Sequence, residues 1–145
     1  MAESFDGFGL AEDNTAFGAM VCDIATFRSI YRLHLRSMER RPENAVLVMI
    51  RARRQNESGI SEEDRSDAMN RIGAALASKL RRHDVLTGFD TSFFLIMLFN
   101  IDAEDAEKVM RRLIEKINEE AGGDADIETK LQAVAPVGGD RVFEV

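Results

Sequence analysis

Cysteine and histidine, the residues of disulfides, thiol chemistry and zinc sites, are scarce in this sequence. The chain of 145 residues has one cysteine, Cys22, and two histidines, His34 and His83. A lone cysteine forms no internal disulfide, and two histidines without a cysteine cluster do not make a zinc site. No base for Cys22 is evident in the sequence, so we expect it to be a small buried hydrophobe on a helix. We therefore expect no zinc site, and we expect no cofactor.

Long apolar runs and an excess of positive charge are also missing. No run approaches the ~20 apolar residues of a membrane-spanning helix, and the N-terminus lacks the basic, apolar and small-residue order of an export signal. The formal net charge is −7 at pH 7, which disfavours nucleic acid as a partner. These absences predict a protein of a reducing, bacterial-type cytoplasm with no membrane span and no nucleic-acid partner.

The sequence does contain enough apolar residues for one core. Its hydrophobic content is 45%, which suits a single domain of this length. Residues 1–16 mix glycine, acids and scattered aromatics without a sustained period, which is typical of a linker or N-terminal leader. We expect the folded domain to span residues 17–145.

Three segments have the apolar period and the end signals of helices. Apolar residues recur at helical spacing from Phe17 until Pro42 stops the pattern, which predicts a long N-terminal helix. An N-cap residue followed by acids in the first turn predicts two further helices, at 61–82 and 102–119.

Five segments are predicted to be strands. They are residues 45–50, 85–87, 93–99, 127–137 and 141–145, of which 45–50 and 93–99 are continuous apolar runs. The run AVLVMI at 45–50 is bounded by charge, as is typical of a central strand that is covered on both faces. Turn-forming residues at 88–92 join the second and third runs, so residues 81–98 (RRHDVLTGFDTSFFLIML) contain a β-hairpin.

The order of these elements predicts an α+β fold, an α/β sandwich of the ferredoxin-like, split βαβ kind. A long N-terminal helix precedes a β-α-β-β-α-β unit and one further strand. The expected sheet is antiparallel, with the helices at 61–82 and 102–119 packed on one face. The expected buried strand residues are Val46, Val48, Ile50, Leu95, Met97 and Val134. Because many functions share this plan, the fold alone names none.

The second half of the chain has a distinctive order of motifs. An R-x-x-D pattern at 81–84 precedes the turn DTSFF at 90–94, an apolar strand and an acid-capped helix. This order resembles the second half of a GGDEF domain, the diguanylate cyclase family. AVLVMI falls where that family has the strand leading to its metal-binding aspartate, and GGDRVFEV at 138–145 is similar to its closing strand. The resemblance covers residues 17–145 and implies a role in cyclic di-GMP signalling.

The turn at 90–94 departs from the GGDEF pattern at four of its five places. In the family a glycine pair lets the substrate approach the backbone, the third residue is an acidic metal ligand, and the fourth assists the reacting hydroxyl. Here those places hold Asp90, Thr91, Ser92 and Phe93, and only Phe94 matches. A plain hairpin turn also explains these residues, because Asp and Ser side chains bond readily to turn backbone.

Both metal positions that the resemblance implies have lost their carboxylates. Arg51 stands in place of the aspartate after the apolar strand, and Ser92 in place of the acidic signature residue. Magnesium-assisted phosphoryl transfer needs carboxylates close to the triphosphate, and an arginine adds a charge that repels the cation. We therefore expect a degenerate domain with no catalytic residue. The arginines at 51, 53 and 54 either solvate a strand end or bind phosphate.

Arg81 and Asp84 keep the R-x-x-D pattern of the family's inhibitory site. The resemblance implies that the arginine binds phosphate and guanine edges of cyclic di-GMP, and that the aspartate accepts hydrogen bonds from guanine. The alternative is structural. Arg81 is then the cation at a helix C-terminus, and Asp84 turns the chain into the following strand.

Three functions remain open at the level of sequence. The first is a catalytically inactive GGDEF-like regulatory domain that contacts a protein partner, an upstream signalling domain or a second copy of the chain. The second is a cyclic di-GMP receptor that uses Arg81 and Asp84. The third is an active diguanylate cyclase, for which the sequence shows no convergent carboxylates.

Overall fold

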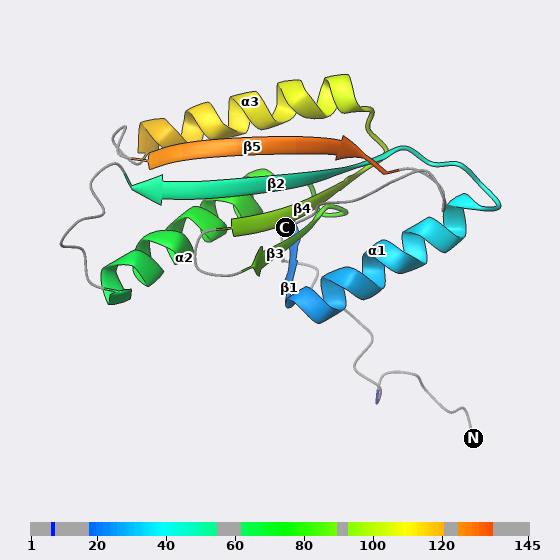
Figure 1. Cartoon of the computed structure of the whole chain (residues 1–145), viewed down its shortest axis with the longest axis horizontal. Coiled ribbons are helices and arrows are strands. Elements are labelled where there is room, and N and C mark those ends of the chain that lie inside the picture. The colour runs from blue at the N-terminus through cyan, green and yellow to red at the C-terminus, as the bar shows by residue number, and fades with distance from the viewer. Residues whose placement is uncertain (1–6, 8–17, 55–61, 90–92, 121–124, 135–145) are drawn as a thin grey trace.

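Eight elements form the part of the chain that the structure describes. The computed structural model describes Gly7 and residues 18–54, 62–89, 93–120 and 125–134. In chain order the elements are β1 (Met20–Cys22), α1 (Ile24–Met38), β2 (Ala45–Arg54), α2 (Glu62–Lys79), β3 (Val85–Phe89), β4 (Phe93–Phe99), α3 (Ala103–Glu120) and β5 (Ala125–Ala133). Figure 1 shows the strands as one layer with helices on both sides.

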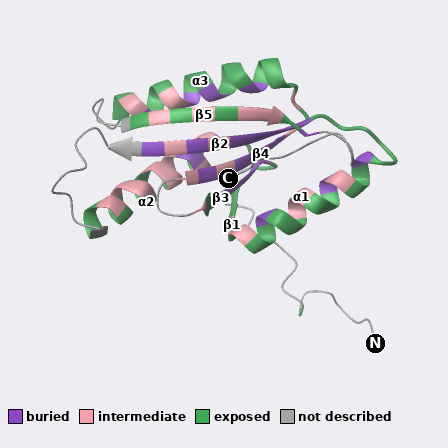
Figure 2. Cartoon of the chain, in the orientation of Figure 1, coloured by how far each residue is buried: buried purple, intermediate pink, exposed green. Residues whose placement is uncertain are grey.

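The sheet has five strands in the order β1-β3-β4-β2-β5. The ladders between β3, β4, β2 and β5 are antiparallel, as the sequence predicts, whereas β1 runs parallel to β3. The sheet is therefore mixed. The register places Val48 opposite both Ile96 and Leu131 in the centre, and Figure 2 shows β2 and β4 buried along most of their described length.

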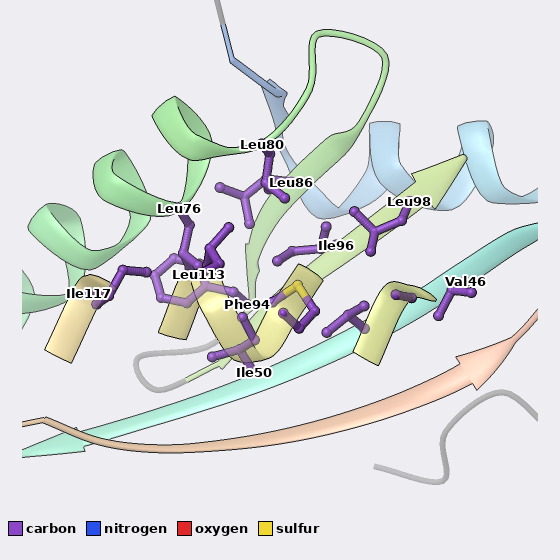
Figure 3. Packing of buried hydrophobic residues seen from close by; sticks show 13 residues of the cluster. Val46, Ile50, Leu76, Leu80, Leu86, Phe94, Ile96, Leu98, Leu113 and Ile117 are labelled. Carbon is purple, nitrogen blue, oxygen red and sulfur yellow. The ribbon is translucent and has the colours of Figure 1, made fainter. Parts of the chain in front are cut away.

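Helices α2 and α3 pack on one face of the sheet, which confirms the prediction for these two helices. Leu76 and Leu80 of α2 and Leu113 and Ile117 of α3 belong to one buried cluster with strand residues. The strand residues of this cluster include Val46, Val48, Ile50, Leu86, Phe94, Ile96 and Leu98. Figure 3 shows the labelled side chains from both helices pointing towards Phe94 and Ile96.

The opposite face is covered by α1. Phe27 and Met38 of α1 form a second buried cluster with alternate residues of the same strands. Those residues are Ala45, Leu47, Val85 and Met97, together with Val134, which follows β5. Because successive residues of a strand point to opposite faces, α1 lies across the sheet from α2 and α3. Of the residues predicted to be buried, Leu95 is only partly buried against this cluster.

The prediction of a long helix from Phe17 was wrong for residues 18–22, while Phe17 itself lies outside the described residues. Met20–Cys22 form the short strand β1, and α1 begins at Ile24. The Asp23 side chain caps this helix by accepting a hydrogen bond of 2.7 Å from the Thr26 backbone N–H. Cys22 therefore lies on a strand, where it packs partly buried against the second cluster. Burial, followed by the nearby Asp23 charge, raises the pKa of the Cys22 thiol.

A close approach of backbone fixes the start of β1. Gly18 has a φ of 84°, and a Cβ there would clash with the carbonyl of Ala77 in α2. The next residue donates a backbone hydrogen bond of 2.8 Å to the same carbonyl, and Met20 donates one of 2.9 Å to the Asp84 carbonyl. The strand is thus attached to the end of α2 and the start of β3.

Several expectations lie outside the described residues. They are the linker at 1–16 apart from Gly7, Phe17, the N-cap residue at 61, the turn residues at 90–92, and residues 135–145, which include the end of the strand at 127–137 and the final strand at 141–145. The flanks of the hairpin are described, and Phe89 pairs with Phe93 across it. Among the described helices, none is both long enough and apolar enough to cross a membrane.

Candidate functional site

The rim of the sheet beside the hairpin places Arg51 and Phe93 next to each other. Arg51 on β2 and Phe93 on β4 are partners at the end of their antiparallel ladder. The guanidinium carbon of Arg51 lies 5.7 Å from the centroid of the Phe93 ring. This distance allows a cation–π attraction. The two positions that the resemblance links to metal binding and catalysis therefore hold a cation and an aromatic ring.

The third neighbour at this rim is Glu128 of β5. It is the register partner of Arg51 on the other side of β2, and its carboxylate lies 4.0 Å from the Arg51 guanidinium. The two side chains are 39% and 61% exposed, so the ion pair contributes little to stability. The Arg51 Nε is buried and has no hydrogen-bond partner among the described residues.

The residues at this rim do not fit a magnesium ion. A guanidinium has only donors and carries a fixed positive charge, and a phenyl ring offers no ligand atom. Glu128 offers a carboxylate, but the Arg51 guanidinium lies 4.0 Å from it and repels a cation there. Ser92, the second predicted position, lies outside the described residues. In the described part of the chain, no three His, Cys, Asp or Glu side chains gather closely enough to hold a metal ion.

Arg81 and Asp84 come together in an internal clasp, which we define as these two residues and Phe99. The Asp84 side chain is 1% exposed. Its carboxylate accepts hydrogen bonds from the Arg81 backbone N–H at 3.0 Å, from Arg81 Nε at 3.1 Å and from Arg81 Nη2 at 3.2 Å. It also accepts one from the Phe99 N–H at 3.3 Å.

The clasp closes through the other side of Phe99. Arg81 Nη2 donates a hydrogen bond of 2.9 Å to the Phe99 carbonyl, and the Asp84 N–H donates one of 3.0 Å to the Arg81 carbonyl. The clasp thus joins the segment after α2 to the start of β3 and the end of β4. Both Asp84 carboxylate oxygens are used inside the protein, while the Arg81 side chain is 45% exposed.

The two histidines take different positions near the clasp. His83 is half exposed, with its Nε2 at 3.9 Å from the Asp84 carboxylate. His34 on α1 is buried and packs edge-to-face on the Phe99 ring, with centroids 5.1 Å apart. Its Nε2 has no hydrogen-bond partner among the described residues.

Sequence reasoning did not identify Phe99 as the third member of the clasp or Glu128 as a neighbour of Arg51. Phe99 lies 18 residues from Arg81 along the chain, and only the sheet register brings the two together. An apolar residue that contributes through its backbone leaves no trace in a sequence pattern. For Glu128 the sequence does offer a signal. Successive side chains of a strand point to opposite faces of the sheet, so the alternation along β5 indicates which residues share a face with Glu128.

No protein-family model matches this chain, and no curated protein sequence matches it. Solved structures do match. The GGDEF domain of FimX from Pseudomonas aeruginosa matches with a TM-score of 0.68 at 14% identity, over 83% of this chain and 79% of that chain. The diguanylate cyclase SiaD from Pseudomonas aeruginosa, in complex with its activator SiaC, matches with a TM-score of 0.66 at 18% identity. A DGC protein from Thermotoga maritima matches with a TM-score of 0.62 at 15% identity, over 78% of this chain and 81% of that chain.

The protein has the GGDEF-like fold. The match to SiaD covers 82% of this chain and 48% of the SiaD chain, so the present chain spans about half of that protein. The Arg51–Phe93 pair lies on β2 and on β4, the strand that follows the hairpin turn.

Proposed function

We propose that this GGDEF-like domain is a catalytically inactive signalling module that regulates through protein contacts in a bacterial cytoplasm. Its partner is a protein, either a separate chain or an upstream signalling domain. The observation that supports the proposal is the Arg51–Phe93 pair. It occupies the strand positions where the sequence resemblance places a metal-binding carboxylate and the residue that assists the reacting hydroxyl.

Electrostatics give the physical reason. During phosphoryl transfer, magnesium ions bridge the oxygens of the triphosphate and the carboxylates of the protein. A guanidinium at the carboxylate position attracts the phosphates but repels the cation, and its charge is not removed at accessible pH. Phe93 cannot exchange a proton, so neither residue performs the chemistry of the acid that it replaces.

The test is an incubation of the whole chain with GTP and magnesium, followed by chromatographic detection of cyclic di-GMP. We expect no product after a long incubation at high protein concentration. Product from the wild type that disappears in the Phe93→Ala variant would overturn the proposal, because it would show catalysis at this hairpin. The Arg112→Ala variant, altered at an exposed site on α3, is the matched control.

A cyclic di-GMP receptor that uses Arg81 and Asp84 is the second proposal. The half-exposed Arg81 guanidinium favours it, since a forked donor suits phosphate and guanine edges. The buried Asp84 carboxylate disfavours it, because guanine would have to replace hydrogen bonds that the clasp already makes. Titration calorimetry with cyclic di-GMP separates the two proposals, and a saturable heat that is lost in the Arg81→Ala variant, while circular dichroism shows that variant folded at the assay temperature, would establish the receptor.

A further inference from the structure

The outer side of α1 carries a regular row of arginines. Arg28, Arg32 and Arg36 follow one another at every fourth residue and are all exposed, so they lie along one side of the helix. Phe27, His34 and Met38 form the buried side of the same helix. Figure 2 shows the exposed and buried sides of α1, with the buried side turned towards the sheet. We call Arg28, Arg32 and Arg36 the arginine row.

The arginine row has no counter-charges on its own helix. Between Ile24 and Met38 there is no acidic residue, and none of the ion pairs formed between described residues includes a member of the row. Two more exposed arginines, Arg40 and Arg41, follow in the turn after the helix. Like charges at this spacing repel each other on a helix. The row therefore weakens the free helix rather than supporting it.

A single large apolar side chain lies beside the arginine row. Leu33 is 67% exposed, and its neighbours one turn away on either side, Ser29 and Ser37, are small and exposed. An isolated apolar side chain between short polar ones projects from the surface and is free to pack against apolar residues of a partner. Arginine is among the residues enriched at protein interfaces, and an exposed leucine beside the row adds apolar area to it.

The charge of the arginine row contrasts with the rest of the molecule. The chain has 19 basic and 26 acidic residues, so without the five arginines at 28, 32, 36, 40 and 41 it has 14 basic residues against 26 acidic ones, a net charge of −12. An extended polyanion, such as duplex DNA or an anionic bilayer, would also contact the acidic remainder of the chain and would be repelled by its negative charge. A compact acidic partner that contacts only α1 would avoid this repulsion.

We propose that the arginine row, with Leu33, is the docking surface for an acidic helix of a partner protein. Successive arginines are separated by about 6 Å along the axis, which matches carboxylates at every fourth position of a facing helix. Guanidinium groups bind carboxylates through two parallel hydrogen bonds. Leu33 packs against an apolar residue between the partner's acids. The inference rests on the proposed function, because it names the surface through which protein contacts act.

The test measures binding of a labelled synthetic helical peptide with glutamate at every fourth position and leucine between, by fluorescence anisotropy at low and physiological salt. A peptide with lysine in place of glutamate is the control probe. The whole chain should bind the glutamate peptide, more weakly as salt rises, and should not bind the lysine peptide. Absence of glutamate-peptide binding at low salt overturns the inference.

Matched variants distinguish the arginine row from net charge. The variant Arg28→Gln/Arg32→Gln/Arg36→Gln should lose about tenfold in affinity, as expected for three exposed ion pairs. The control variant Arg71→Gln/Lys108→Gln/Arg112→Gln removes the same charge from exposed positions of α2 and α3 and should retain affinity within about twofold. Equal losses in both variants would overturn the inference, because they would show a long-range charge effect.

Further probes exclude other occupants of the surface. Duplex DNA or anionic phosphatidylserine vesicles that bind as tightly as the glutamate peptide would overturn the assignment to a protein helix. Sedimentation that shows a dimer lost in the arginine-row variant would overturn it in favour of a second copy of the chain. These outcomes are independent of the cyclic di-GMP assay, so failure of the docking surface and failure of catalytic inactivity are distinguishable.

Discussion

Asp84 connects three segments of the chain through one buried carboxylate. It receives hydrogen bonds from Arg81 on one side and from Phe99 on the other, and its own carbonyl accepts from Met20 of β1. A buried carboxylate needs such partners, because removing an ion from water is costly unless its charge is compensated. At the level of the residue, the R-x-x-D pattern is therefore part of the architecture of the sheet.

Replacing Arg81 tests this structural role. The Arg81→Ala variant leaves the Asp84 carboxylate buried with two fewer hydrogen-bond donors and without its cation. We therefore expect the free energy of unfolding to fall by about 2 kcal/mol. This loss is smaller than for a fully buried ion pair, because the Arg81 side chain is half exposed. Urea denaturation measures the change, and Arg112→Ala on the exposed side of α3 serves as the control. An unchanged unfolding free energy in Arg81→Ala would contradict the clasp and favour a ligand-binding role for that arginine.

At the level of the element, α1 combines a well-formed start with an unfavourable charge pattern. Asp23 caps its first turn, whereas the arginine row places like charges one turn apart. The two features have opposite effects on the helix. Each can be altered without touching the buried side, which Phe27 and Met38 occupy.

The N-cap gives a pH-dependent prediction. Hydrogen bonds from Thr26 hold the pKa of the Asp23 carboxyl below its usual value of 3.8. A carboxyl with a lowered pKa in the folded state stabilises the protein above its unfolded pKa and loses that effect as the pH falls through the folded value. Asp23→Ala should therefore lower the melting temperature at neutral pH, and the difference should shrink below pH 3.8. A difference that is constant across this range would contradict the capping account.

The arginine row predicts a substitution that stabilises the protein. Arg32→Gln removes two repulsive contacts, with Arg28 and with Arg36, and should raise the free energy of unfolding by about 0.4–1 kcal/mol. Glutamine has nearly the same helix propensity as arginine, so the change reports mainly on charge. Chemical denaturation at low salt measures it, and added salt should reduce the gain. A destabilised variant would show that Arg32 has a structural contact.

The sequence predicted the elements whose signals are local. It failed for elements whose conformation depends on pairing with a distant strand. The sequence signals at 61–82 and 102–119 are an N-cap residue, acids in the first turn and an amphipathic period, and the helices α2 and α3 form there. The helix α2 ends at Lys79, before the arginines at 81 and 82 that were predicted to end it. Residues 20–22 match a helical period as well as a strand, and only the parallel partner β3 selects the strand. In the site, the identities of Arg51 and Phe93 were evident, but their contact depends on the β2–β4 register.

At the level of the whole molecule, the sheet separates two packed faces. The α2 and α3 side and the α1 side each contain a buried cluster, and the Arg51–Phe93 pair lies at the rim where the β2–β4 ladder ends. The core therefore does not depend on the chemistry of that rim. Such an arrangement lets a fold persist after a site has changed its residues.

The central claim is that this rim does not bind magnesium and nucleoside triphosphate for catalysis. Titration calorimetry of the whole chain with GTP, in the presence and absence of magnesium, tests it most directly. We predict no saturable heat that requires magnesium, because Arg51 repels the cation and Phe93 offers no ligand atom. Saturable magnesium-dependent binding of GTP that is lost in Phe93→Ala, but kept in Arg112→Ala, would contradict the account.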